Sequence, residues 1–115
     1  MTLNDMEAHV WDRLPTLQRM AGRRLVSRVV RRAVIGWPIP VLEQCDAAQS
    51  EIVAKHYTRE VERAVRADMQ MGFWTLLIFS ALVQEIVRIM VRWWLERQEH
   101  RTDMRLLTRE ARNHD

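Results

Sequence analysis

Glycine and proline are scarce in this chain, at three residues each among 115, and tyrosine and phenylalanine together contribute only three. Because a sheet needs turn residues at short intervals with β-branched or aromatic runs between them, this scarcity argues against a β fold. Alanine, leucine, methionine, arginine, glutamate and glutamine dominate instead, and these residues are good helix formers. The composition therefore predicts an all-α protein.

Cysteine is limited to Cys45, so the chain cannot form an internal disulfide. Residues 1–12 are polar and acidic, and they lack the apolar core of a secretory signal peptide. We therefore expect the protein to act in the cytoplasm, as part of a particle, or in association with the inner membrane.

Signatures of catalytic and metal sites are also missing from the sequence. The four histidines stand far apart, and no His-Glu-x-x-His, Glu-x-x-His or Cys-x-x-Cys pattern occurs. These patterns are the usual marks of zinc and di-iron sites. The three glycines are too dispersed to form a phosphate-binding loop. The sequence predicts a non-enzymatic protein without catalytic residues, bound metal or cofactor.

The order of the elements predicts a single helical domain over residues 1–115. Residues 1–35 are expected to form two short helices with a basic character. Residues 36–40 contain two prolines and are predicted to form an extended linker. Residues 41–112 follow a helical apolar period in which Gly72 is the only weak point. One long helix and a pair of helices with a bend at this glycine both fit the period, and the bend is favoured.

The stretch from Phe73 to Leu95 is the most apolar part of the chain. Its first eleven residues are apolar on almost every side of a helix, so protein or lipid must surround it. Because the preceding helices are short, we expect copies of the chain or another protein to cover it. The predicted oligomerisation, docking or membrane face consists of Phe73, Trp74, Leu76, Ile78, Phe79, Leu82, Val83, Ile86, Met90, Trp93 and Trp94.

A membrane span is the alternative for the same stretch. Aromatic pairs stand at its two ends about twenty residues apart, which suits a hydrocarbon core about 30 Å thick. Against a lone span, four polar residues form one stripe along the helix: Gln84, Glu85, Arg88 and Arg92. A charged residue at the centre of a span costs about 2.5–3.5 kcal/mol, whereas each Leu or Ile returns only about 0.3–0.6 kcal/mol. The stripe therefore favours packing against protein, or several copies that enclose it.

A basic amphipathic helix is expected earlier in the chain. Arg24, Arg28, Arg31 and Arg32 fall on one side of this helix, and the opposite side is apolar. Such a face can meet acidic residues of a partner, nucleic acid or an anionic membrane. Residues 41–70 contain six acids against four bases, which favours pairing within the chain or between subunits. Nucleic acid is weakly supported, because no DNA-binding motif or aromatic stacking position accompanies the face.

These patterns favour a helical assembly or structural subunit that oligomerises or docks in a larger complex, such as a virion, through residues 73–95. Its partners would be copies of itself or other subunits of the complex. The alternative is a membrane-embedded or membrane-inserting oligomer, holin-like, pore-forming or accessory to a membrane complex. The third hypothesis is a nucleic-acid-binding helical module.

Overall fold

The computed structural model describes residues 1–113, which form seven α-helices and no strand. The prediction of an all-α fold is therefore confirmed. The helices are α1 (Leu3–Arg13), α2 (Thr16–Arg19), α3 (Arg23–Ile35), α4 (Ile39–Leu42), α5 (Ala47–Asp68), α6 (Phe73–Glu96) and α7 (Glu99–Asn113).

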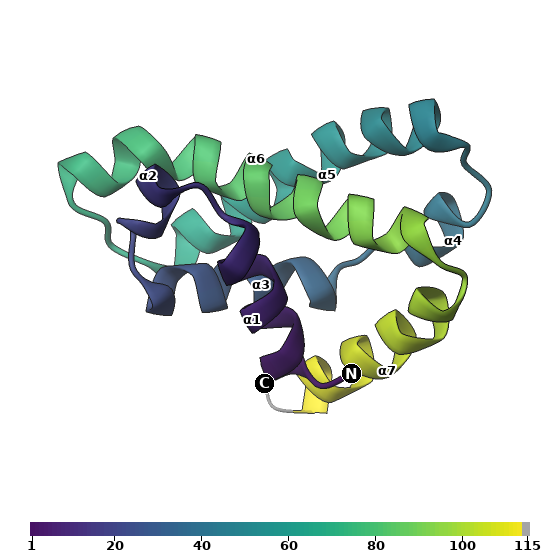
Figure 1. Ribbon diagram of the computed structural model, residues 1–115. Helices are drawn as coiled ribbons and strands as arrows, with labels where there is room; N and C mark the ends of the chain where they lie inside the picture. Colours follow the sequence, from purple (N-terminus) through teal and green to yellow (C-terminus); the bar gives the residue numbers. More distant parts are fainter. Residues whose placement is uncertain (114–115) are drawn as a thin grey trace.

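Helix α6 runs along the upper side of the molecule in Figure 1 and packs against α1, α2, α3, α5 and α7. Helix α5 folds back along α6, and α1, α3 and α7 pack against other faces of the same core. The apolar side chains from Phe79 to Trp94 are almost all buried. The molecule measures 39 × 30 × 25 Å, so the longest helix runs most of its length.

The bend favoured near Gly72 is present. Helix α5 ends at Asp68, and α6 begins after a non-helical segment of four residues. Because of this bend, α5 can bury Tyr57, Val61 and Val65 in the core that it shares with α6. The segment after residue 40 is therefore not a continuous rod.

The N-terminal region contains three helices rather than two, because Gly22 interrupts the second predicted helix. Gly22 has a φ of +96°, a left-handed conformation that residues with a side chain rarely adopt. The interruption leaves α2 as a single turn, and the basic helix α3 starts immediately afterwards.

The extended linker predicted for residues 36–40 is wrong in its second part. Pro40 lies in the first turn of α4, where a residue needs no backbone N–H donor. In the first part, Gly36 allows a close approach of Tyr57, whose hydroxyl would lie 2.8 Å from a Cβ added at the glycine. That hydroxyl donates to the Ala33 carbonyl (2.6 Å) and so ties α5 to the end of α3.

The predicted helical region 41–112 also divides at two places besides the bend. Residues 43–46 separate α4 from α5, and the Asp46 carboxylate caps α5 by accepting from the Gln49 backbone amide (2.8 Å). This pattern is a capping box. Residues 97–98 separate α6 from α7. The first break separates α4, which packs against α5, and the second lets α7 pack against α3 and α6.

Polar contacts join α1 to α7 and to α3. The Leu3 backbone N–H donates to the Glu110 carboxylate (3.1 Å), which links the first helix to the last. The Ser27 hydroxyl donates to the Glu7 carboxylate (2.7 Å), which links α3 to α1. Together these contacts hold the N-terminal helix across the core.

Candidate docking surface

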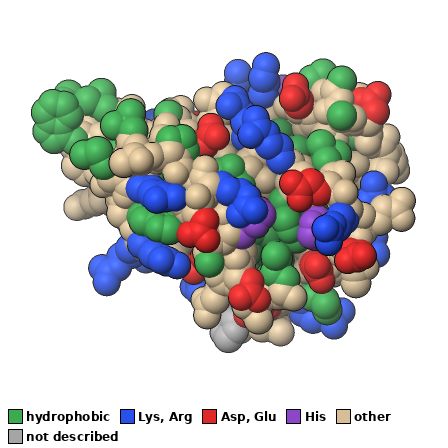
Figure 2. All heavy atoms as spheres, viewed as in Figure 1, with side chains coloured by type: hydrophobic (Ala, Val, Ile, Leu, Met, Phe, Trp, Pro, Cys, Tyr) green, Lys and Arg blue, Asp and Glu red, His purple; other side chains and the backbone are tan. Residues whose placement is uncertain are grey.

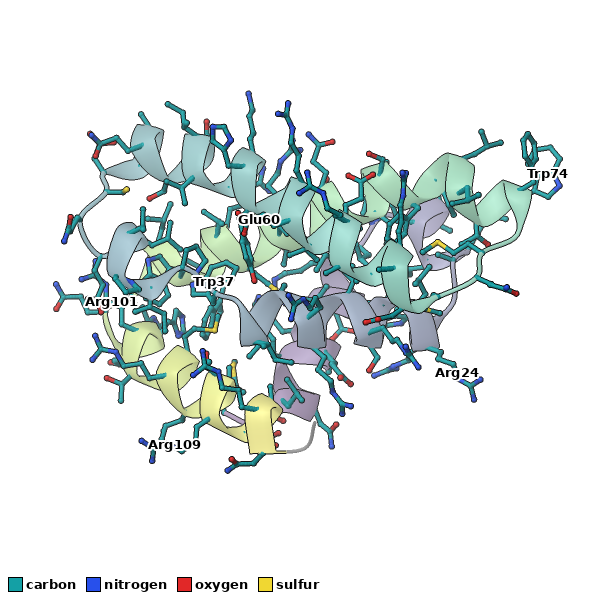
Figure 3. The ribbon with its side chains drawn as sticks, turned by 180° about the vertical axis from the view of Figure 1, so that it is seen from behind. Arg24, Trp37, Glu60, Trp74, Arg101 and Arg109 are labelled. Carbon is teal, nitrogen blue, oxygen red and sulfur yellow. The ribbon has the colours of Figure 1, made fainter. Side chains whose placement is uncertain are left out.

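The first turns of α6 project beyond the helices that cover the rest of it. Phe73 and Trp74 are 69% and 78% exposed, Leu77 is 59% exposed, and Leu76 is also exposed. Figure 3 shows Trp74 pointing away from the body of the molecule at the start of α6. We call Phe73, Trp74, Leu76 and Leu77 the apolar tip.

The two aromatic rings of the apolar tip contact each other rather than the core. Phe73 and Trp74 lie edge to face, with ring centroids 5.6 Å apart. Helix α6 begins here without a side-chain cap, because its N-cap residue is Gly72. The tip therefore presents both apolar side chains and the positive end of a helix dipole to its surroundings.

Helix α2 adds apolar side chains at this end of the molecule. It packs against α6, and its Leu17 and the following Met20 are exposed. The Arg19 guanidinium fixes α2 by donating to the carbonyls of Trp11 and Asp12 at the end of α1 (3.1 and 2.9 Å). Figure 2 shows hydrophobic side chains gathered over the projecting end on the left of the view.

The structure divides the predicted apolar face into an exposed part and a buried part. Phe73, Trp74 and Leu76 are exposed, and Ile78 is half-buried. The remaining members are buried, namely Phe79, Leu82, Val83, Ile86, Met90, Trp93 and Trp94. Partners cannot reach this second group in the present fold, because the chain's own helices cover it. The expectation that one chain has too few helices to cover this stretch is wrong there.

The aromatic residues at the far end of α6 belong to the core. Trp94 lies near Trp37 (ring centroids 6.3 Å apart), which in turn meets the Tyr57 ring edge to face (5.8 Å). Trp93 stacks on His100 at 4.1 Å. These rings therefore connect α6 to the segment before α4, to α5 and to α7, whereas Phe73 and Trp74 at the tip are exposed.

The predicted polar stripe faces solvent. Gln84, Arg88 and Arg92 are exposed, and Glu85 is half-buried. Arg88 and Glu85 form a salt bridge of 3.4 Å, one turn apart on α6. The stripe therefore lies on the surface of the folded chain, partly along a shallow hollow between α5 and α6.

Helix α6 is long and apolar enough to cross a membrane, and it is the only helix in residues 1–113 that is. Length and composition alone are weak evidence, because a core helix can satisfy the same criteria. In this structure the section after Ile78 serves as such a core helix.

The four arginines of the predicted basic face are all exposed on α3, where they line a shallow hollow with Asp68 of α5. These residues are Arg24, Arg28, Arg31 and Arg32. Within residues 1–113 none of them forms a salt bridge. The predicted pairing inside the chain is therefore not formed there, whereas pairing with another molecule stays a prediction.

Within residues 1–113, no cluster of three or more His, Cys, Asp or Glu side chains could hold a metal ion. Cys45 is half-buried, and its thiol lies 3.1 Å from the Val41 carbonyl. Burial, followed by the charge of Arg13, lowers the pKa of His9 below its ordinary value of 6.5. The absence of enzymatic activity stays a prediction.

Comparison of the chain with protein-family models, with curated proteins and with solved structures found no significant match. The surface of the molecule is therefore the guide to its function.

Proposed function

We propose that this chain is a non-enzymatic helical docking subunit that joins a larger assembly through the apolar tip. One observation carries the proposal: α6 buries its large apolar side chains from Phe79 to Trp94 but exposes four of them at its start. The tip is therefore a small part of residues 73–95, the whole of which the sequence predicted as a docking element.

The clustering of these side chains distinguishes the tip from the rest of the surface. Burying a side chain such as Leu or Phe contributes about 1.5–3 kcal/mol, so four exposed ones forgo a substantial stabilisation. Single exposed apolar residues elsewhere, such as Ile52 and Leu106, are ordinary on a folded protein. A cluster at a projecting end is typical of an interaction site, and tryptophan is enriched where binding energy concentrates.

The buried section of α6 prepares the tip for docking. The same helix continues from Leu77 into a segment fixed on several sides by the core. A rigid helix holds its first turns in place before binding, which reduces the conformational entropy lost on association. We therefore propose that residues 79–94 hold the tip in position and that residues 73–77 contact the partner.

The test uses the full chain in extracts of the cells that naturally produce it. We expect the wild-type chain to migrate with a large assembly or a membrane fraction during gentle fractionation. The double variant Trp74→Ser/Leu77→Ser should migrate as the free chain. The matched control is Ile52→Ser, because Ile52 and Leu77 are equally exposed, at 59%.

Circular dichroism should show that both variants keep the helical content of the wild type, since every altered side chain is exposed. A wild-type chain that migrates alone would contradict the proposal. Retention of the double variant in the assembly would contradict it as well.

The membrane-spanning alternative has less support from the fold. To span a bilayer, α6 would have to expose Phe79 to Trp94 to lipid and leave its contacts with α3 and α5. The nucleic-acid alternative is supported only by the exposed arginines of α3.

A further inference from the structure

We infer that the partner of the apolar tip is the surface of an anionic lipid bilayer, which the tip enters without spanning it. This inference rests on the proposed docking function and names the partner. It follows from the charge around the tip, from the depth to which the tip can reach, and from its small area.

Arginines lie at the same end of the molecule as the tip and outnumber the acid beside them, which is Asp68. Residues 13–42, which include α2 and α3, contain seven arginines, with Arg13 counted, and no acid. Helix α2 packs against α6, and Arg23 and Arg24 are exposed at the start of α3. In Figure 3, Arg24 lies at the same end of the molecule as Trp74. In Figure 2, Lys and Arg side chains lie below the projecting hydrophobic group.

These arginines are available to an anionic partner. Neither Arg23 nor Arg24 forms a salt bridge with an acid in residues 1–113. The guanidinium of Arg23 lies 5.5 Å from the ring centroid of Trp11, which orients it without neutralising it. The uncapped start of α6 adds backbone N–H groups that favour a phosphate.

The depth of the tip suits the interfacial layer of a bilayer. Only residues 73–77 project before α6 enters the core, and five helical residues extend about 7 Å along the axis. Interfacial helices bury their apolar face by about 5–10 Å at the boundary of headgroups and acyl chains. Tryptophan favours this boundary because its ring is amphipathic. The tip therefore matches shallow insertion and is far too short to cross.

A second copy of the chain is a poorer partner. A stable protein interface buries about 800 Å² on each side and involves about 20–30 residues, whereas the tip consists of four. A two-fold contact between tips would also bring the arginines of both copies together, and like charges repel. A lipid surface avoids both difficulties, since its anionic headgroups neutralise the arginines around each tip.

The experiment is flotation of the full chain with vesicles. One vesicle contains equal parts of phosphatidylcholine and phosphatidylglycerol, and the other contains phosphatidylcholine alone. We expect binding to the anionic vesicle that weakens as salt rises, and little binding to the neutral one. Trp74→Ser/Leu77→Ser should reduce the partition coefficient more than about tenfold, because insertion depends on these side chains. Ile52→Ser should leave it unchanged.

The arginines are tested by Arg23→Gln and Arg24→Gln. Each substitution should weaken binding to the anionic vesicle about fivefold, because a basic residue near such a surface contributes on that scale. The same substitutions made at Arg105 and Arg109 on α7 are the control and should have a smaller effect, since Figure 3 shows Arg109 away from the tip.

Several results would overturn the inference. The wild-type chain could fail to bind either vesicle, or it could bind both equally at all salt concentrations. It could also stay on the vesicles after alkaline carbonate washing, which would indicate a membrane span. If vesicle binding fails but the tip variant still leaves its assembly in extracts, docking stands and the partner is a protein. If the tip variant changes neither measurement, the docking function fails too.

Discussion

The two sections of α6 both carry large apolar side chains but have opposite surroundings. Residues 73–77 project into solvent, whereas residues 79–94 form the centre of the core. Leu77 and Leu82 illustrate the contrast, since the first is exposed and the second is fully buried. The composition of a helix shows which of its side chains favour burial. The positions of the neighbouring helices decide which of them are buried.

Replacing the two leucines by alanine should give the largest difference between the sections. Leu82→Ala should lower the free energy of unfolding by about 2–5 kcal/mol, because it removes buried methyl groups and leaves a cavity. Leu77→Ala should change it by less than about 0.5 kcal/mol, because the side chain is already in water. Urea denaturation of both variants measures the difference. Equal losses would mean that the tip is packed in solution.

A smaller effect on stability is expected at the C-terminal end of α6, where aromatic rings pack against it. Trp94, Trp37 and Tyr57 form a line of contacting rings there, and Gly36 lies against the tyrosine hydroxyl. Gly36→Ala should lower stability by about 1–3 kcal/mol, because its Cβ would crowd that hydroxyl.

The double-mutant cycle with Tyr57→Phe isolates this contact. Without the hydroxyl oxygen, the nearest atom to the new Cβ is a ring carbon at 3.4 Å, so the cost of Gly36→Ala should fall. Thermal unfolding of the four proteins measures the coupling. If Gly36→Ala lowers stability equally with and without Tyr57→Phe, the contact with the hydroxyl is not the cause.

The polar stripe should contribute little to the stability of the folded chain. Glu85→Gln removes the half-buried member of the 3.4 Å pair with the exposed Arg88. Because water and salt screen such pairs, the free energy of unfolding should change by less than about 0.5 kcal/mol. A loss of several kcal/mol would indicate that the stripe is enclosed, as in an oligomer with these residues inside. Urea denaturation at two protein concentrations distinguishes these results.

The smallest expected effect concerns acid sensitivity beside the buried section. His9 lines a hollow with Trp93 and Glu96, and burial is the main cause of its lowered pKa. The unfolded chain therefore binds more protons at this residue as the pH falls below 6.5, and stability should decline. His9→Gln should reduce that decline. Unfolding curves measured well above and well below this pH compare the two proteins, and identical declines would exclude His9 as the cause.

The sequence predicted the helical class, the bend and the common face of the polar stripe. Scarce glycine and proline indicated helices, and Gly72 was the weakest point of the long apolar period. The start of α5 was not predicted, because the apolar period continues across it. Asp46 and Gln49 have the spacing of a capping box, and this signal could have indicated it.

The division of α6 could not be predicted from its own residues. A helical wheel shows which side chains need cover, and it does not show how far each neighbouring helix extends. The exposed tip depends on where α5 ends and where α6 enters the core, which only the packed chain determines. The break at Gly22 was not predicted either, because a single glycine within a helical period does not reveal that it adopts a left-handed conformation.

The contact between Leu3 and Glu110 joins two residues that are made at very different times during synthesis. The two residues are 107 positions apart, so α1 leaves the ribosome long before its acceptor on α7 exists. Until then the apolar side chains of α1, including Met6 and Val10, lack part of their final surroundings. Helix α3 can cover much of α1 early in synthesis, whereas the cover that α7 provides is added only when the last described helix has been made.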